Sequence, residues 1–295
     1  MLGLQITATE FSCFRIRQLL YEVSILAVQS KTFESYGARV SISSSSTELI
    51  EKAVSAARNA VLGNCSITED PDLKVASDFL FEKEADGQFV FFQDGKLWYR
   101  SESEYLLFKS FDAMLRLAVA ENAVDTVFLH AGVVGWKGKA VVFPGTSQIG
   151  KSTLVAELIR NGSEYFSDEY AVFDQEGFVH PFARDLSIRD WEPGRFVTAV
   201  SPSYFGADIR EAKAQTGAVL FLKFAEGSEW KPETMSLGQG ILEALPHALP
   251  LHSNTKLSME VLKKGFENAI IAKSYRCDAR IASREILDFL DKCMN

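Results

Sequence analysis

The chain has 295 residues, of which 47% are hydrophobic and 24% charged, and these globular values exclude a disordered or fibrous chain. Thirty-one Lys and Arg against 39 Asp and Glu give a net charge of −8, which argues against a nucleic-acid partner. No apolar run approaches the ~18 residues that span a bilayer. The first residues lack the pattern of a secretory signal. We therefore expect a cytoplasmic protein with no membrane partner.

The four cysteines form no CxxC pair, which argues against both a zinc site and a disulfide framework. The chain is about twice the ~150 residues of an average domain, so we expect one large or two modest domains.

The N-terminal third predicts a small α+β domain. Residues 11–28 fit a helix or a strand pair, and residues 40–42 alternate as a short strand. Residues 48–62 are rich in alanine and end at Gly63-Asn64, as a helix does. Three strands in a meander follow, at residues 78–83, 88–92 and 96–100.

The pattern Ser101-x-x-Glu104 predicts a capping box that opens a helix over residues 102–122. We place the domain boundary in this helix, with an N-terminal domain at 1–110 and a catalytic domain at 111–295. The expected core-facing stripe of the helix is Tyr105, Phe108, Phe111, Met114, Leu115 and Ala118.

A buried strand at residues 139–143 runs into the one motif with a clear chemical meaning. The loop Gly145-Thr146-Ser147-Gln148-Ile149-Gly150-Lys151-Ser152 matches GxxxxGK[ST], and Thr153 leads into a helix at 154–160. Its glycines let successive N–H groups point at one anion, and the helix N-terminus adds more donors. In such a loop Lys151 contacts the β- and γ-phosphates, and the Ser152 hydroxyl is a ligand of Mg²⁺.

Two adjacent acids, Asp168 and Glu169, end the next apolar stretch, residues 165–170. Neighbouring residues of a regular strand point to opposite faces, so both acids reach one site only where the strand ends. One would then hold Mg²⁺ while the other takes a proton from an attacking hydroxyl; a solvated strand end is the alternative. His130, between Leu129 and Ala131, fits either a core histidine or a functional one.

Together, the segments 129–134, the phosphate loop and 167–171 resemble the C-terminal catalytic domain of bacterial HPr serine kinase/phosphorylase. They are closer still to the HPr-kinase-related proteins, as are residues 178–188 and 218–224. The similarity covers about residues 125–295. It implies an α/β fold with a mixed, largely antiparallel sheet, that is, the P-loop kinase core of the HPr kinase and PEP carboxykinase type. It also implies a homo-oligomer.

The resemblance implies roles for three side chains outside the loop. His130 would lie near the γ-phosphate or Asp168, and Asp168 would act as the base. Glu169 stands where the HPr kinases usually have a second Asp, and would support the base or hold the metal together with Ser152.

A second departure follows the acids, because residues 187–195 lack the Glu-Ile-Arg-Gly type signature of the HPr kinases. This departure leaves open both HPr as the acceptor and the reverse, phosphorylase reaction. Three arginines remain candidates to stabilise transition-state charge, with plain surface solvation as the alternative: Arg184, Arg189 and Arg195.

The C-terminal stretch predicts helices at 237–245 and 255–272, an edge strand at 274–277 and a capped helix at 283–293. His247 and His252 are interpreted as loop histidines.

These features predict a kinase that uses ATP, or another nucleoside triphosphate, with Mg²⁺. Its acceptor would be a hydroxyl of a protein, a peptide or a small molecule, as in a tailoring kinase of a biosynthetic cassette. The alternative is a nucleotide-binding regulatory module whose N-terminal domain binds a partner without phosphoryl transfer.

Overall fold

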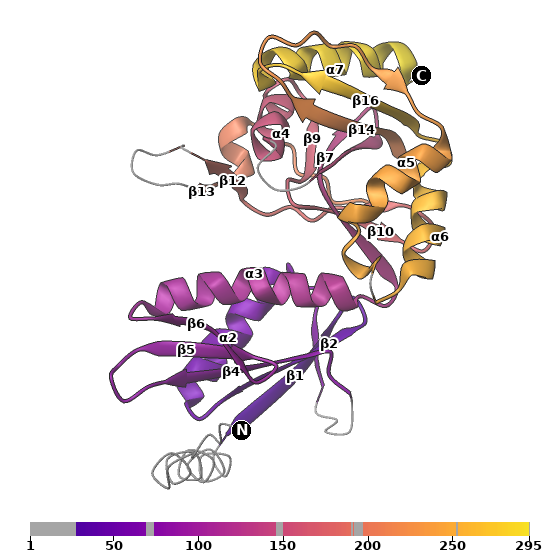
Figure 1. The fold of residues 1–295 in the computed structure, drawn as a ribbon. Coiled ribbons are helices and arrows are strands. Elements are labelled where there is room, and N and C mark those ends of the chain that lie inside the picture. Colours follow the sequence, from indigo (N-terminus) through magenta and orange to yellow (C-terminus); the bar gives the residue numbers. More distant parts are fainter. Residues whose placement is uncertain are drawn as a thin grey trace, which may run out of the picture. The chain divides into compact units, whose positions relative to one another are not determined.

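The structure is a computed structural model that describes residues 28–68, 74–145, 150–189, 191, 197–251 and 253–294. The chain forms two units, Met1–Val119 and Ala120–Asn295. Both combine helices with a mixed sheet, which confirms the expected α/β class (Figure 1). The predicted element at 11–28 lies outside the described residues, apart from Val28 at its end.

The first unit contains a six-stranded sheet in the order β3-β1-β2-β4-β5-β6. Its pairings are antiparallel except for β2 and β4, which run parallel because the helix α2 crosses between them. The predicted helix and meander are confirmed, whereas β1 and β3 were not expected. The elements are β1 (Gln29–Ser35), β2 (Ala38–Ser44), α2 (Thr47–Ala60), β3 (Ser66–Thr68), β4 (Ser77–Lys83), β5 (Phe89–Gln93), β6 (Lys96–Ser101) and α3 (Glu104–Asn122).

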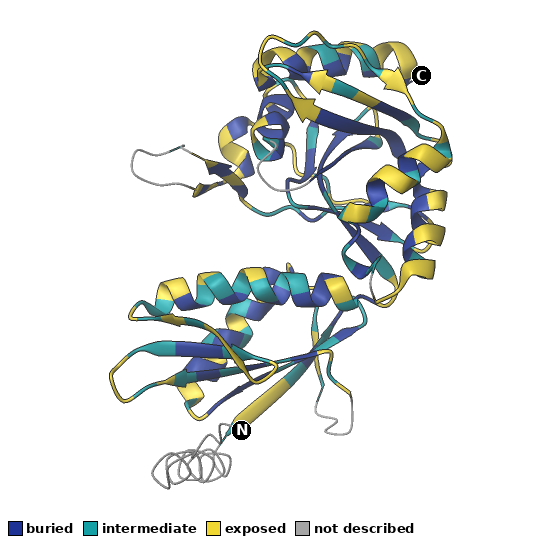
Figure 2. Ribbon diagram, viewed as in Figure 1, coloured by how far each residue is buried: buried dark blue, intermediate teal, exposed yellow. Residues whose placement is uncertain are grey.

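One cluster of buried side chains joins α2 and α3 to this sheet (Figure 2). Phe111 of α3 is at its centre, with its ring edge-on to Phe81 at 4.8 Å and to Phe79 at 5.1 Å between centroids. The predicted stripe is partly wrong, because Tyr105 is 72% exposed and Leu107 is buried instead.

The predicted cap of α3 is displaced by two residues. The Ser103 hydroxyl accepts the N–H of Leu106, whereas Ser101 accepts the N–H of Ser103 and shapes the turn before the helix. Ser101 and Ser103 are both residue types that cap helices, so the sequence pattern alone does not decide which of them caps α3. The path of the chain before the helix decides it.

The second unit is built on an eight-stranded mixed sheet in the order β11-β10-β7-β8-β14-β16-β15, with β9 also pairing with β7. β8, β14 and β16 run parallel, and the other pairings are antiparallel. Its strands are β7 (Thr126–Trp136), β8 (Lys139–Pro144), β9 (Glu164–Ser167), β10 (Tyr170–Asp174), β11 (Val179–His180), β14 (Thr216–Phe224), β15 (Glu233–Thr234) and β16 (Ile270–Arg276). A separate hairpin consists of β12 (Leu186–Arg189) and β13 (Val197–Val200).

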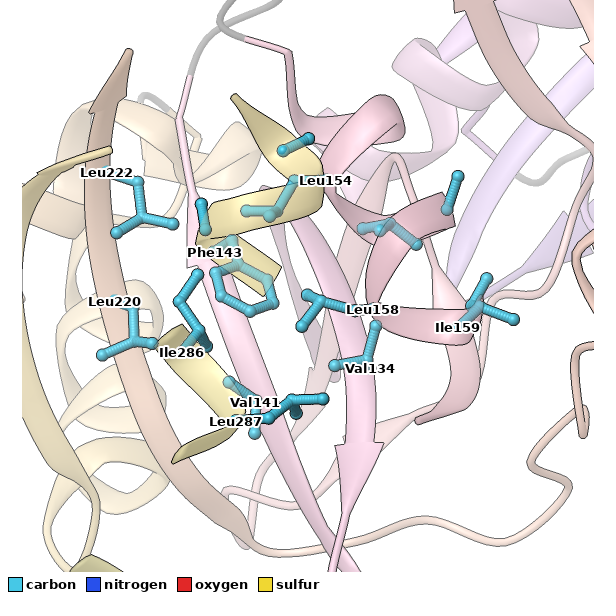
Figure 3. Close-up of a cluster of buried hydrophobic side chains, with 14 of the residues drawn as sticks. Val134, Val141, Phe143, Leu154, Leu158, Ile159, Leu220, Leu222, Ile286 and Leu287 are labelled. Carbon is cyan, nitrogen blue, oxygen red and sulfur yellow. The ribbon is translucent and has the colours of Figure 1, made fainter. Parts of the chain in front are cut away.

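Helices cover both faces of this sheet. One face packs on α4 and α7, where Phe143 of β8 lies among Leu154, Leu158 and Ile286 (Figure 3). The other face packs on α5 and α6. Because both faces are covered, β8 is apolar and buried at every position after Lys139, as its sequence indicated. The helical elements are α4 (Lys151–Arg160), η2 (Pro202–Phe205), α5 (Leu237–Ala244), η3 (Leu245–His247), η4 (Leu249–Leu251), α6 (Thr255–Phe266) and α7 (Ala279–Cys293).

Three predictions for the C-terminal stretch are corrected. The helix predicted to reach residue 272 ends at Phe266, and Ile270 already belongs to β16. β16 is not an edge strand, because β15 pairs on its outer side. The last helix is capped by Asp278, which accepts the N–H of Arg280, and Ser283 is buried within it.

The aromatic cluster of the first unit gives a stability prediction. Phe111→Ala should lower the free energy of unfolding of that unit by about 3–5 kcal/mol, because it leaves a cavity among three phenylalanine rings. Denaturant titration of the full chain measures the change. Tyr105→Ala on the same helix is the control and should shift stability by less than about 0.5 kcal/mol, since its side chain is largely in solvent. Equal losses in the two variants would contradict the packing described.

Candidate functional site

The phosphate-binding motif lies where β8 leaves the sheet and α4 begins. Residues 146–149, which include the predicted Thr146, Ser147, Gln148 and Ile149, lie outside the described residues. Gly145 starts the loop and donates its N–H to the carbonyl of His130 at 3.1 Å. Gly150 ends it with φ of 79°, a left-handed conformation that glycine adopts without strain, and caps α4.

Gly150 is also required by a close neighbour. A Cβ at this position would lie 2.5 Å from Nη2 of Arg276. The buried Arg276 guanidinium donates to the carbonyls of Gly150 at 3.2 Å and Cys277 at 3.1 Å. Arg276, the last residue of β16, therefore holds the end of the loop at Gly150.

Lys151, the first residue of α4, is buried, and its Nζ donates to the carbonyl of Gly145 at 2.7 Å. Burial lowers the pKa of this ammonium to about 8, against the opposing effect of Asp168 and Glu169. The lysine thus closes the two ends of the loop on each other.

Asp168 is joined to the next residue of α4. The Ser152 hydroxyl donates to Oδ2 of Asp168 at 2.8 Å, and the N–H of Ser187 donates to the same oxygen at 3.0 Å. The Tyr165 hydroxyl lies 3.5 Å from Oδ1. Burial raises the pKa of this carboxyl, although both hydrogen bonds to Oδ2 oppose the shift.

The two acids lie in a bend, as the strand-end hypothesis required. β9 pairs with β7 up to Ser167, β10 resumes the pairing at Tyr170, and Asp168 and Glu169 lie between them. The Ser167 hydroxyl accepts the N–H groups of Glu169 and Tyr170 at 3.1 and 3.0 Å, which holds the bend. Tyr170 is the direct partner of His130, so the bend places the acids beside that histidine.

A cavity of about 250 Å³, here called the carboxylate cavity, collects the predicted residues. Arg189 and Val197 line it from the β12–β13 hairpin. Arg184 does not line this cavity, although its carbonyl accepts from the Tyr165 hydroxyl, and Arg195 lies outside the described residues. The site residues on its wall are His130, Gly150, Lys151, Ser152, Thr153, Asp168 and Glu169.

His247 is the residue near the loop that the sequence interpretation missed. The backbone of Ala248 pairs with Leu129, which brings η3 beside β7 and the loop. Burial and then Lys151 lower the pKa of His247. Burial, Lys151 and His247, in that order, lower the pKa of His130 to about 4. No spacing in the sequence predicts that His247 lies near the loop, because η3 comes to lie beside β7 only when the chain folds. The other loop histidine, His252, is outside the described residues.

Within the described part of the chain, no three His, Cys, Asp or Glu side chains cluster so as to enclose a metal ion. Mg²⁺, however, takes only one or two carboxylates from proteins that bind it with substrate phosphates. Ser152 and Asp168 provide such a partial ligand set. No helix among the described residues is long and apolar enough to cross a membrane.

Comparisons with solved structures find distant neighbours of this chain. No known family profile matches the sequence, and no curated protein matches it. The structure of the Hpr(Ser) kinase/phosphatase from Coxiella burnetii is similar over 56% of this chain and 94% of its own length, at 14% identity and a TM-score of 0.29. The functional assignment below therefore rests on the geometry of the site.

His130 gives a pH-dependence of stability. Its pKa falls from an ordinary 6.5 to about 4 on folding, so between these values the unfolded chain binds the proton and the folded chain does not. Stability should therefore fall as the pH drops from 6.5 to 4, by about 3 kcal/mol at most. Unfolding titrations across this range give the free energies of unfolding of wild type and of His130→Gln. The value for wild type minus the value for His130→Gln should fall as the pH drops toward 4. Parallel pH curves would contradict the burial of a neutral imidazole.

Lys151 gives a second pH-dependence, this time of anion binding. Its ammonium loses the proton as the pH rises through about 8, and with it the charge that attracts phosphate. The affinity for inorganic tripolyphosphate should therefore weaken between pH 7 and 9 in wild type. Lys151→Arg keeps its charge over this range and should show a flatter curve by calorimetry. The same slope in both proteins would disprove the role of the lysine.

Proposed function

We propose that the protein is a kinase that transfers the γ-phosphoryl group of a nucleoside triphosphate to a hydroxyl. Its core would be of the P-loop type found in the HPr kinases, which the sequence resembles. The hydrogen bond between Ser152 and Asp168, next to Lys151 at the N-terminus of α4, is the observation that carries the proposal. In P-loop enzymes a loop Ser or Thr and a strand-end Asp hold Mg²⁺ together, while the loop and its Lys hold the phosphates.

The buried carboxylate of Asp168 is suited to bind a cation. Its side chain is buried, and burial raises its pKa. An ionised carboxylate buried without a cation is costly, and a divalent ion would offset this cost. When bound, Mg²⁺ would neutralise phosphate charge, with Ser152 and Asp168 as its protein ligands.

Glu169 then becomes the candidate base. Because Asp168 is engaged by Ser152 and Ser187, it fits the metal side of the cavity, which leaves Glu169 on the wall beside His130 to accept the proton of the acceptor hydroxyl. These roles are the reverse of those implied by the resemblance. With a pKa of about 4, His130 is neutral at pH 7 and would orient a phosphate oxygen or the acceptor without adding charge.

The proposed acceptor enters through the carboxylate cavity, past the β12–β13 hairpin. A serine-type hydroxyl of a protein, a peptide or a small molecule fits this chemistry. The first unit would contribute recognition of the acceptor or of a partner protein.

Two amide variants distinguish the roles of the acids. Asp168→Asn should raise the Mg²⁺ concentration for half-maximal nucleotide binding or turnover at least tenfold, because a metal ligand is lost. Glu169→Gln should lower turnover about 10²- to 10⁴-fold with that Mg²⁺ concentration unchanged, since general base catalysis contributes about this much. Acceptor-dependent ADP release, measured with a library of hydroxyl compounds and peptides, gives the turnover.

Glu211→Gln is the control, because Glu211 is an exposed acid outside the carboxylate cavity and should change neither property. If the Mg²⁺ dependence moves with Glu169→Gln instead, the two roles are exchanged. Wild-type protein that binds no nucleoside triphosphate would refute the proposal. Tight binding without any acceptor-dependent turnover would identify a nucleotide-binding module instead.

A further inference from the structure

A second cavity, of about 320 Å³, lies at the carboxyl ends of the three parallel strands β8, β14 and β16. We call it the strand-end cavity. Pro144 and Gly145 line it from the end of β8, and Glu243 and His247 line it from α5 and η3. None of the predicted catalytic side chains of the sequence analysis lines it.

The floor of this cavity is set by strand register. Phe221 of β14 pairs with Lys273 of β16, and two residues further on Lys223 pairs with Tyr275. Residues two apart on a strand share a face, so all four side chains lie on one face of the sheet. Phe221 is buried and Tyr275 is 59% exposed, whereas Leu222 belongs to the buried cluster on the opposite face of the sheet. The floor therefore consists of two aromatic rings with Lys223 and Lys273 beside them, and Lys273 pairs with Glu233 at 3.2 Å.

One hydrogen bond lies between the two cavities. Lys151 lines the carboxylate cavity, and Gly145, whose carbonyl accepts from Lys151 Nζ at 2.7 Å, lines the strand-end cavity. Gly145 and Gly150, which begin and end the loop, thus line different cavities. A ligand held by the loop thus has a cavity at each end.

The geometry of phosphoryl transfer decides which cavity would take the acceptor hydroxyl and which would take the rest of the nucleotide. The attacking and leaving oxygens lie roughly in line on opposite sides of the transferred group. The acids that would serve the attacking hydroxyl line the carboxylate cavity, so the leaving diphosphate and what it carries must extend away from it. In open α/β sheets ligands also bind outside the carboxyl ends of the parallel strands.

We propose that the strand-end cavity binds the nucleoside part of the triphosphate, with the Tyr275 ring stacked on the base. This inference rests on the proposed function. The volume falls in the range of small-molecule sites. Glu243 and His247 provide polar groups at the wall, and the lysines of the lining, which also includes Glu233, suit a ligand that carries phosphates.

Tyr275→Ala tests the inference through a comparison of two probes. ATP carries a base and inorganic tripolyphosphate does not, so the variant should weaken ATP about tenfold and leave tripolyphosphate unchanged. Tyr275→Phe keeps the ring and should bind ATP as wild type does. Tyr105→Ala, which removes an equally exposed tyrosine from the first unit, is the control and should change neither affinity. Calorimetry with Mg²⁺ present gives each dissociation constant.

Photolabelling with 8-azido-ATP gives a second, independent readout. Peptides from residues 216–224 or 270–276 should carry the label, and peptides from 186–200 should not. Label on the β12–β13 hairpin, or equal loss of both probes in Tyr275→Ala, would overturn the inference. If wild type binds ATP no tighter than tripolyphosphate, the nucleoside site is absent while the proposed phosphate site stands. If wild type binds neither probe, both proposals fail.

Discussion

The hydrogen bond between the Ser152 hydroxyl and the buried carboxylate of Asp168 joins the start of α4 to the bend between β9 and β10. It exists only because β7 pairs with β8 along one edge and with both β9 and β10 along the other. The loop that leaves β8 and the bend opposite β7 are thereby brought to one place. The N–H of Ser187 completes the arrangement from β12, so the order of the strands determines the site.

Charged side chains of both signs line the two cavities. The chain is acidic overall, yet Lys151 and Arg189 line the carboxylate cavity beside Asp168 and Glu169, and three lysines line the strand-end cavity beside Glu233 and Glu243. Burial and Lys151 lower the pKa values of His130 and His247, so neither imidazole adds positive charge there at pH 7. The net charge argues against a broad basic surface, and it did not show that cations and acids meet at these two cavities.

Helix α2, the meander, strand β8 and helix α4 were predicted correctly, because local patterns specify them. Alanine-rich periodicity, Asp-Gly turns and the spacing of two glycines before Lys151 act over a few residues. The errors came where the choice depends on distant packing. Ser103 rather than Ser101 caps α3, and residues 270–272 joined β16 because parallel pairing with β14 outweighed a continuing helical pattern.

The amino-acid sequence alone contains the GxxxxGK[ST] motif with its lysine and the adjacent acids, and it indicated the α/β class, since each depends on residue types at short, fixed spacing. Only the tertiary structure decided which acid meets Ser152, that His247 lies near Lys151, and that a second cavity opens at Gly145. Those relations join residues about 16 to 130 positions apart. They arise from strand order and register, which no local spacing encodes.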